Sequence, residues 1–196
     1  MRGSVILIAL LGVLLIGGCG GCNSYNGFVS KGTDVDNAFS KIQSAYQRRA
    51  DLIPNLVETV KGEANFEKST LTGIVEARAK ATSMNIDPSK ITPEQMKSFQ
   101  ENQQGLSNAI GRLLVVTENY PQLRANDAFR QLQAQLEGTE NRIKVERDKY
   151  NDVATDYNKS VRLFPGNIFA RLFGFAERAP FEADKGAEKA TKVKFD

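Results

Sequence analysis

The sequence predicts an all-α protein, an elongated antiparallel four-helix bundle preceded by an N-terminal signal or anchor segment. The main observation is a stripe over 127–164, where apolar residues recur at alternating steps of three and four, the spacing of one helical face. A helix of this length is about 55 Å long, too long for a compact globule to surround, so its stripe must lie against other long helices. The same spacing recurs in earlier segments, and no segment of useful length shows the alternation of a β-strand. The stripe positions are Phe129, Leu132, Leu136, Thr139, Ile143, Glu146, Tyr150, Val153, Tyr157, Ser160 and Phe164.

The composition indicates one domain of about 170 residues after the N-terminal segment. The net charge is only +3, and acidic and basic residues are interspersed, so the chain lacks the basic stripe that nucleic acid binding needs. There is no histidine, and both cysteines, Cys19 and Cys22, fall in the N-terminal segment. The folded part therefore has neither a disulfide nor a thiol nucleophile.

The N-terminal segment has the features of a signal peptide. Arg2 precedes an apolar run over 5–16, which reaches only about 18 Å as a helix, against roughly 30 Å of hydrocarbon to cross. Residues 16–19 (IGGC) resemble the lipobox of bacterial lipoproteins, in which the cysteine, here Cys19, becomes the lipidated N-terminus after cleavage.

The alternative is an uncleaved transmembrane helix over about 4–22, because no charge appears between Arg2 and Lys31. In both interpretations the bundle lies on the exported side of a membrane, periplasmic or extracytoplasmic, by the positive-inside bias. We therefore divide the chain into a signal or anchor segment (1–22), a bundle (23–175), and a polar, loosely ordered tail (176–196). Phe181 and residues 193–195 are expected to pack loosely or to be disordered.

Turn chemistry sets the expected helix boundaries. We expect a polar tether over 20–32 and a helix from Thr33. Asp51 then caps a second helix that holds Pro54 in its first turn, and the alternative is one longer helix kinked at Pro54. This second helix runs to about Ser83.

Prolines mark the remaining boundaries. A loop over 84–93 precedes a third helix, which ends at Pro121 because a residue before proline is disfavoured in the α region. A short connection over 122–126 leads to the long helix, and Pro165 ends it before a short helical stretch over 168–175.

Five polar residues fall on otherwise apolar stripes: Arg49, Glu67, Arg78, Gln103 and Glu146. A carboxylate-bridged metal site is one interpretation, but such sites in helical bundles also use histidine, which this chain lacks. Interhelical ion pairs that fix the register of the helices are the other interpretation. No serine has a histidine to activate it, and no glycine-rich loop joins a strand to a helix to hold phosphate. We therefore predict no catalytic residue, no metal and no cofactor.

Two doublets, Tyr150 with Asn151 and Tyr157 with Asn158, lie seven residues apart in the long helix. This spacing places both tyrosines on the core face and both asparagines beside it. We expect a structural role, in which each phenol reaches a polar partner at a helix seam. A groove for a ligand or a partner is the alternative.

The motifs together resemble the LemA family of bacterial membrane-anchored proteins. The matching residues are Tyr25, Asn26, 48–61 (RRADLIPNLVETVK), Glu67, 77–79 (ARA), 118–126 (ENYPQLRAN), Glu140, 147–151 (RDKYN), Tyr157, Asn158, Phe164 and Pro165. The resemblance spans about 25–175 and implies an antiparallel helical bundle behind one N-terminal membrane segment, with no established enzymatic activity. It also implies a role in maintenance of the cell envelope.

The predicted function is that of a membrane-anchored, non-enzymatic protein that binds another envelope protein, or itself, along an exposed helix face. The alternative is a module that binds a small molecule or a metal through Glu67, Arg78 and Glu146 inside the bundle. Nucleic acid is not an expected partner.

Overall fold

The computed structural model describes residues 2–63, 66–84 and 86–182, with side chains from Gly20 onward. Within these ranges the regular structure is entirely helical, which confirms the predicted fold class. In chain order the elements are α1 (Arg2–Lys61), α2 (Lys68–Thr82), the 3-10 turn η1 (Pro88–Lys90), α3 (Pro93–Thr117), α4 (Pro121–Ala125), α5 (Asp127–Arg162) and α6 (Gly166–Phe173).

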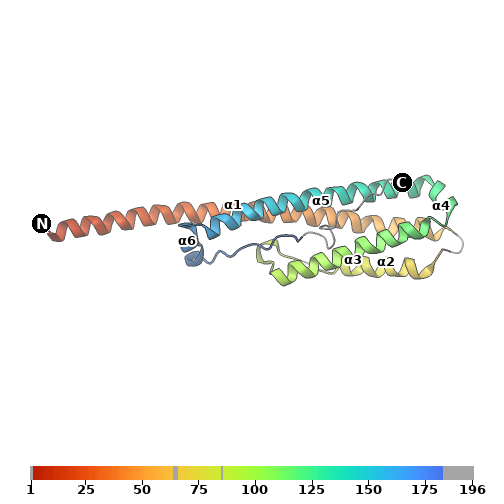
Figure 1. Ribbon diagram of the computed structural model, residues 1–196, viewed down its shortest axis with the longest axis horizontal. Helices are drawn as coiled ribbons and strands as arrows, with labels where there is room; N and C mark the ends of the chain where they lie inside the picture. The colour runs from red at the N-terminus through yellow and green to blue at the C-terminus, as the bar shows by residue number, and fades with distance from the viewer. Residues whose placement is uncertain (1, 64–65, 85, 183–196) are drawn as a thin grey trace, which may run out of the picture.

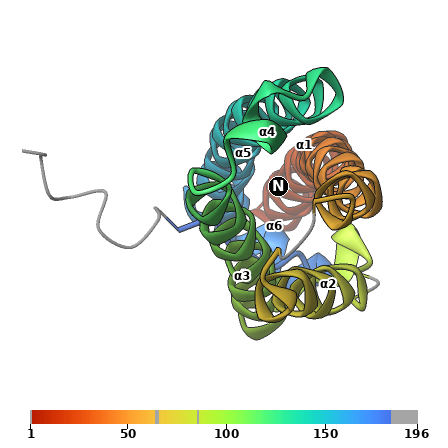
Figure 2. The same ribbon diagram turned by 90° about the vertical axis from the view of Figure 1, so that its right-hand side faces the viewer.

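The four long helices alternate in direction along one axis (Figure 1). Helix α1 lies along α5 and α2 lies along α3, so the bundle consists of two antiparallel pairs (Figure 2). Helix α1 extends beyond the other helices at one end of the molecule (Figure 1). We call this the proximal end, and we call the opposite end, which holds α4, the distal end.

Helix α1 is continuous through two predicted interruptions. The expected tether over 20–32 is helical, and Phe28 within it is buried. The expected boundary at Asp51 is also wrong, and the alternative of one longer helix is correct, because the helix passes through Pro54. Proline has no N–H, so the carbonyl four residues earlier, that of Ala50, loses its helical donor. Arg78 of α2 replaces that donor, since its Nε donates to the Ala50 oxygen at 2.8 Å.

Helices α3 and α5 begin where the sequence indicates. Thr92 and Gln95 form a reciprocal capping box at the start of α3, with bonds of 3.2 and 3.0 Å. The Asn126 side chain accepts hydrogen bonds from the N–H groups of Ala128 and Phe129 in the first turn of α5. The connection before α5 contains one short helix, α4, where we expected only a loop.

The buried side chains form two cores. The proximal core is rich in aromatic residues and includes Phe28, Phe39, Tyr46, Phe99, Tyr150, Tyr157 and Phe181. The distal core is mostly aliphatic and includes Ile53, Leu56, Val60, Ile74, Leu106, Leu113, Phe129 and Leu136. The predicted stripe of α5 is therefore buried at Phe129, Leu136, Ile143 and Tyr157, but its last position, Phe164, is 80% exposed.

Residues 175–182, which we call the strap, return from α6 along the proximal half of the bundle. The expectation that Phe181 packs loosely is wrong, because its ring lies against Phe39 of α1, Phe99 of α3 and Tyr150 of α5. Helix α2 packs into the distal core and its last residues reach only the border of the proximal one, so the strap takes the place of a fourth helix there. Residues 193–195 lie outside the described part of the chain.

Candidate functional site

A buried arginine separates the two cores. Arg49 is 1% exposed, and its Nη2 donates to the main-chain oxygen of Gln103 at 3.0 Å and to its side-chain Oε1 at 2.9 Å. Its Nη1 donates to Ser107 Oγ at 2.5 Å and pairs with Glu140 Oε2 at 2.7 Å. Because Gln103 Nε2 in turn donates to the Ala81 carbonyl, this arginine layer joins α1, α3, α5 and α2.

The arginine layer balances its charge at the edge of the bundle. Glu140 is about half exposed, so the buried guanidinium is neutralised by a carboxylate that keeps part of its hydration. A groove of about 470 Å³ runs beside the layer, with Lys97 and Arg147 among its lining residues. Both terminal nitrogens of Arg49 are already occupied by protein acceptors, which leaves the guanidinium little capacity for a ligand.

Glu146 is the second buried charge, at 1% exposure. Its Oε1 lies 2.8 Å from Arg142 Nε and 3.6 Å from Lys149 Nζ, both one turn away on α5. Both pairs lie within one helix, and in the described part of the chain Glu146 has no ion pair with another helix, contrary to the interhelical pair that we expected. Arg49 and Glu140 do form such a pair, between α1 and α5.

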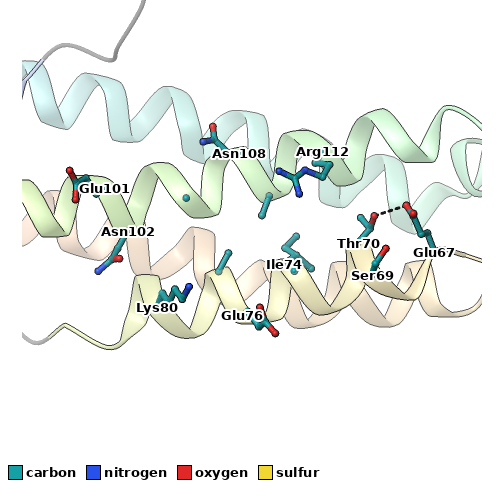
Figure 3. Close-up of a pocket in the computed structure, with 14 residues that line it drawn as sticks. Glu67, Ser69, Thr70, Ile74, Glu76, Lys80, Glu101, Asn102, Asn108 and Arg112 are labelled. Atoms are coloured by element: carbon teal, nitrogen blue, oxygen red, sulfur yellow. Dashed lines mark hydrogen bonds between the residues drawn. The ribbon is translucent and has the colours of Figure 1, made fainter.

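Glu67 and Arg78 do not share a site. Glu67 is exposed rather than interior, and it accepts a hydrogen bond from Thr70 Oγ1 at 2.9 Å (Figure 3). Arg78 is half-buried and lies eleven residues further along, or about 16 Å at the helical rise. Among the residues with described side chains, no three acidic or cysteine side chains are grouped closely enough to hold a metal ion.

The two tyrosine–asparagine doublets bind the strap. The Asn158 amide accepts from the Arg178 N–H and donates to the Arg178 carbonyl, both at 2.8 Å. Asn151 makes the same pair of bonds to Phe181, at 2.8 and 3.1 Å. The tyrosine hydroxyls complete the pattern, since Tyr157 donates to Ala176 O at 3.0 Å and Tyr150 to Ala179 O at 2.8 Å.

The spacing of the doublets matches an extended chain. Seven residues along α5 advance about 10.5 Å, and three extended residues advance about 10 Å. The bonded strap residues are three apart in both series, Arg178 with Phe181 and Ala176 with Ala179. Helix α5 thus holds an extended segment through main-chain atoms, as a neighbouring strand would. The structure places the strap where we left open a groove for a ligand or partner.

Arg178 fastens the strap to the rest of the proximal half. Its Nη1 donates to the carbonyls of Pro88 and Ser89, and its Nη2 lies 3.2 Å from Asp36 Oδ1. Burial raises the pKa of Asp36, and the Arg178 guanidinium opposes that rise. Burial also raises the pKa of the Tyr150 hydroxyl to about 12. Sequence reasoning missed Arg178 because nothing in a polar tail predicts which arginine reaches a distant carbonyl.

A second groove lies between α2 and α3 (Figure 3). It encloses about 590 Å³, and its lining includes the small residues Gly73, Ala77, Gly105 and Ala109. A Cβ atom at Gly73 or Gly105 would meet nothing within 4 Å, so the groove is open at both glycines. Charged side chains of both signs line the same groove, namely Glu67, Glu76, Lys80, Glu101 and Arg112.

Among the helices with described side chains, none combines the length and the hydrophobicity that a membrane crossing requires. The side chains of Cys19, the predicted site of lipid attachment, and of the apolar run over 5–16 are not among those that the structure describes.

The sequence matches one family profile and several known proteins. A profile described as the LemA family matches residues 38–195. The protein LemA of Metamycoplasma hominis is 30% identical over 152 residues, which cover 78% of this chain and 66% of that protein. Magnetosome protein MamQ 2 of Paramagnetospirillum magneticum is 28% identical, over 83% of this chain and 66% of its own. Magnetosome protein MamQ of Magnetospirillum gryphiswaldense is 26% identical, over 77% and 62%. The chain thus spans just under two thirds of the length of these relatives.

Proposed function

Because the chain belongs to the LemA family, we propose that it is a membrane-anchored, non-enzymatic protein that holds a helical segment of an envelope protein in the α2–α3 groove. The N-terminal apolar segment is the anchor, and the bundle lies on the exported side. Two of the relatives are named for the magnetosome rather than for a reaction, which supports a structural role.

The α2–α3 groove is the observation on which this proposal rests. Small residues one turn apart on each helix, Gly73 with Ala77 and Gly105 with Ala109, allow the backbone of a third helix to approach closely. Charges of both signs beside it can set the direction and register of that helix. The buried side chains of Arg49 and Gln103, by contrast, are engaged in hydrogen bonds within the bundle.

Photocrosslinking in cells tests the proposal. A photoreactive amino acid at Glu76, in the groove, should give one discrete protein adduct, and the same probe at the exposed Lys144 of α5 should not. Gly105→Leu should abolish the adduct by filling the groove. The fold should tolerate this change, because a Cβ at Gly105 meets nothing within 4 Å and glycine costs a helix about 1 kcal/mol. Equal adducts at both probe positions, or an adduct that persists with Gly105→Leu, would contradict the proposal.

The second candidate is a module that binds a small molecule or metal. The groove beside Arg49 supports this second candidate, although Glu67 and Arg78 do not share a site. A thermal-shift screen of the chain with metals and nucleotides separates the two candidates. We expect no saturable shift, and a shift of several degrees that disappears with Lys97→Ala, at an exposed position lining this groove, would favour the second.

A further inference from the structure

The proximal end of the bundle carries an exposed apolar surface. Leu163 and Phe164 are 64% and 80% exposed, and Ile168 and Leu172, one turn apart on α6, are 55% and 73% exposed. We call these four residues the α6 patch. Large apolar side chains left in water at adjacent positions indicate an interaction surface, whereas single exposed ones are ordinary.

Helix α6 is fixed to a defined level of α1. Phe169 packs against Gly20 and Gly21, and a Cβ at Gly21 would lie only 3.3 Å from the Phe169 ring. The Phe173 ring meets the Tyr25 ring edge-on at 5.3 Å. The α6 patch is therefore attached to the first turns of α1 that follow the apolar run over 5–16, at the end from which α1 projects (Figure 1).

Both anchoring alternatives put this level at the surface of the membrane. If α1 crosses the bilayer uncleaved, about 20 residues from Val5 span the roughly 30 Å of hydrocarbon, which brings Tyr25 to the interface. If Cys19 is lipidated, its acyl chains enter the bilayer and Gly21 follows within about 3 Å of helical rise. The same lipid surface thus faces α6 in either case.

We propose that the α6 patch inserts into the headgroup region of the lipid bilayer and sets the orientation of the bundle on the membrane. This inference rests on the anchor of the proposed function. Interfacial helices place apolar side chains at the acyl boundary while cationic residues contact anionic headgroups. Arg171, exposed and next to Leu172, supplies the cation. The strap does not compete for the patch, because it leaves α6 at Gly174 and runs toward the middle of the bundle.

Tryptophan fluorescence tests the proposal directly, because the chain has no tryptophan. Leu172→Trp gives a single probe in the α6 patch, and Val115→Trp, at an exposed position near the distal end of α3, is the matched control. The full chain is reconstituted into vesicles of equal parts phosphatidylcholine and phosphatidylglycerol with brominated acyl chains. We expect the probe at position 172 to shift to shorter wavelength and lose most of its emission, and the probe at 115 to do neither.

The outcomes separate the docking of α6 from the anchor. Flotation with the vesicles, together with equal quenching at both positions, would overturn docking and leave the anchor intact. Failure to float would remove the anchor and docking together. A blue shift at position 172 that appears without lipid and grows with protein concentration would assign the α6 patch to a second copy of the chain, and would also overturn the proposal.

Discussion

The proximal and distal halves of this bundle are closed in different ways. In the distal half, α2 supplies a fourth helix, and the core is built from aliphatic residues at helical spacing. In the proximal half the closing element is an extended strap, and the core is built from aromatic rings, several of which meet edge-on. The arginine layer lies between the two.

The difference shows two ways of satisfying main-chain polar groups next to a helix. A helix satisfies its own N–H and C=O groups, so α2 needs only an apolar face. An extended segment cannot do so, and unpaired groups at a buried surface cost free energy. The tyrosine–asparagine doublets of α5 provide the missing donors and acceptors, which explains why polar side chains lie beside the core in one half.

The largest expected effect comes from removing the arginine layer. Arg49→Ala should lower the free energy of unfolding by about 3–5 kcal/mol, because it opens a cavity at a large buried side chain and leaves the acceptors of Gln103 without a donor. Glu140→Gln should cost about 1–3 kcal/mol, because glutamine keeps an acceptor for Nη1 but leaves the buried guanidinium without its counter-charge. Urea denaturation followed by circular dichroism measures both. A loss for Arg49→Ala no larger than that of an ordinary exposed substitution, about 0.5 kcal/mol, would show that the layer does not hold the halves together.

The next effect tests the distal half. Arg78→Met should cost about 1–3 kcal/mol, because it leaves the Ala50 carbonyl without a donor. In a Pro54→Ala background the helical N–H returns, so the loss from Arg78→Met should become clearly smaller. A double-mutant cycle by urea denaturation gives the coupling energy. Additive losses would refute the link between Pro54 and Arg78.

In the proximal half, Asn158→Ala removes both of its bonds to Arg178. We expect the strap to be destabilised by about 1–3 kcal/mol, from two hydrogen bonds of typical net strength. Amide hydrogen exchange at Arg178 and Phe181 should speed up while exchange in the distal helices stays unchanged. Asn141→Ala, at an exposed position on the same helix, is the control. If both variants behaved alike, the two hydrogen bonds between Asn158 and Arg178 would contribute nothing to holding the strap.

The last effect is confined to alkaline solution, so at neutral pH it is the smallest. The pKa of Tyr150 is about 12 in the folded protein and near 10 when unfolded, so folding favours its neutral form. Its contribution to stability is complete below pH 10 and is lost as the pH rises toward 12. Tyr150→Phe should flatten this decline. The midpoint of urea unfolding, measured between pH 9 and 12 for both proteins, tests this expectation. If the midpoint falls as steeply with pH in the variant as in the unchanged protein, Tyr150 is excluded as the cause.

Local sequence determined the helical class, the start of α3 at its capping box and the long stripe of α5. These features depend on contacts within a few residues, which periodicity and capping chemistry report directly. The sequence also marked Arg49 as a polar residue at an apolar position, with an interhelical ion pair as one interpretation, and it placed the tyrosines of both doublets on the core face.

Only the tertiary structure decided the partners. Pro54 read locally as the start of a helix, but Arg78, distant in sequence, supplies the donor that lets α1 continue. Phe181 read as part of a loose tail, but three helices enclose it. Phe164 continued the stripe of α5, yet it lies in water beyond the end of the core. In each case the free energy comes from groups far apart along the chain, and periodicity within one segment carries no information about them.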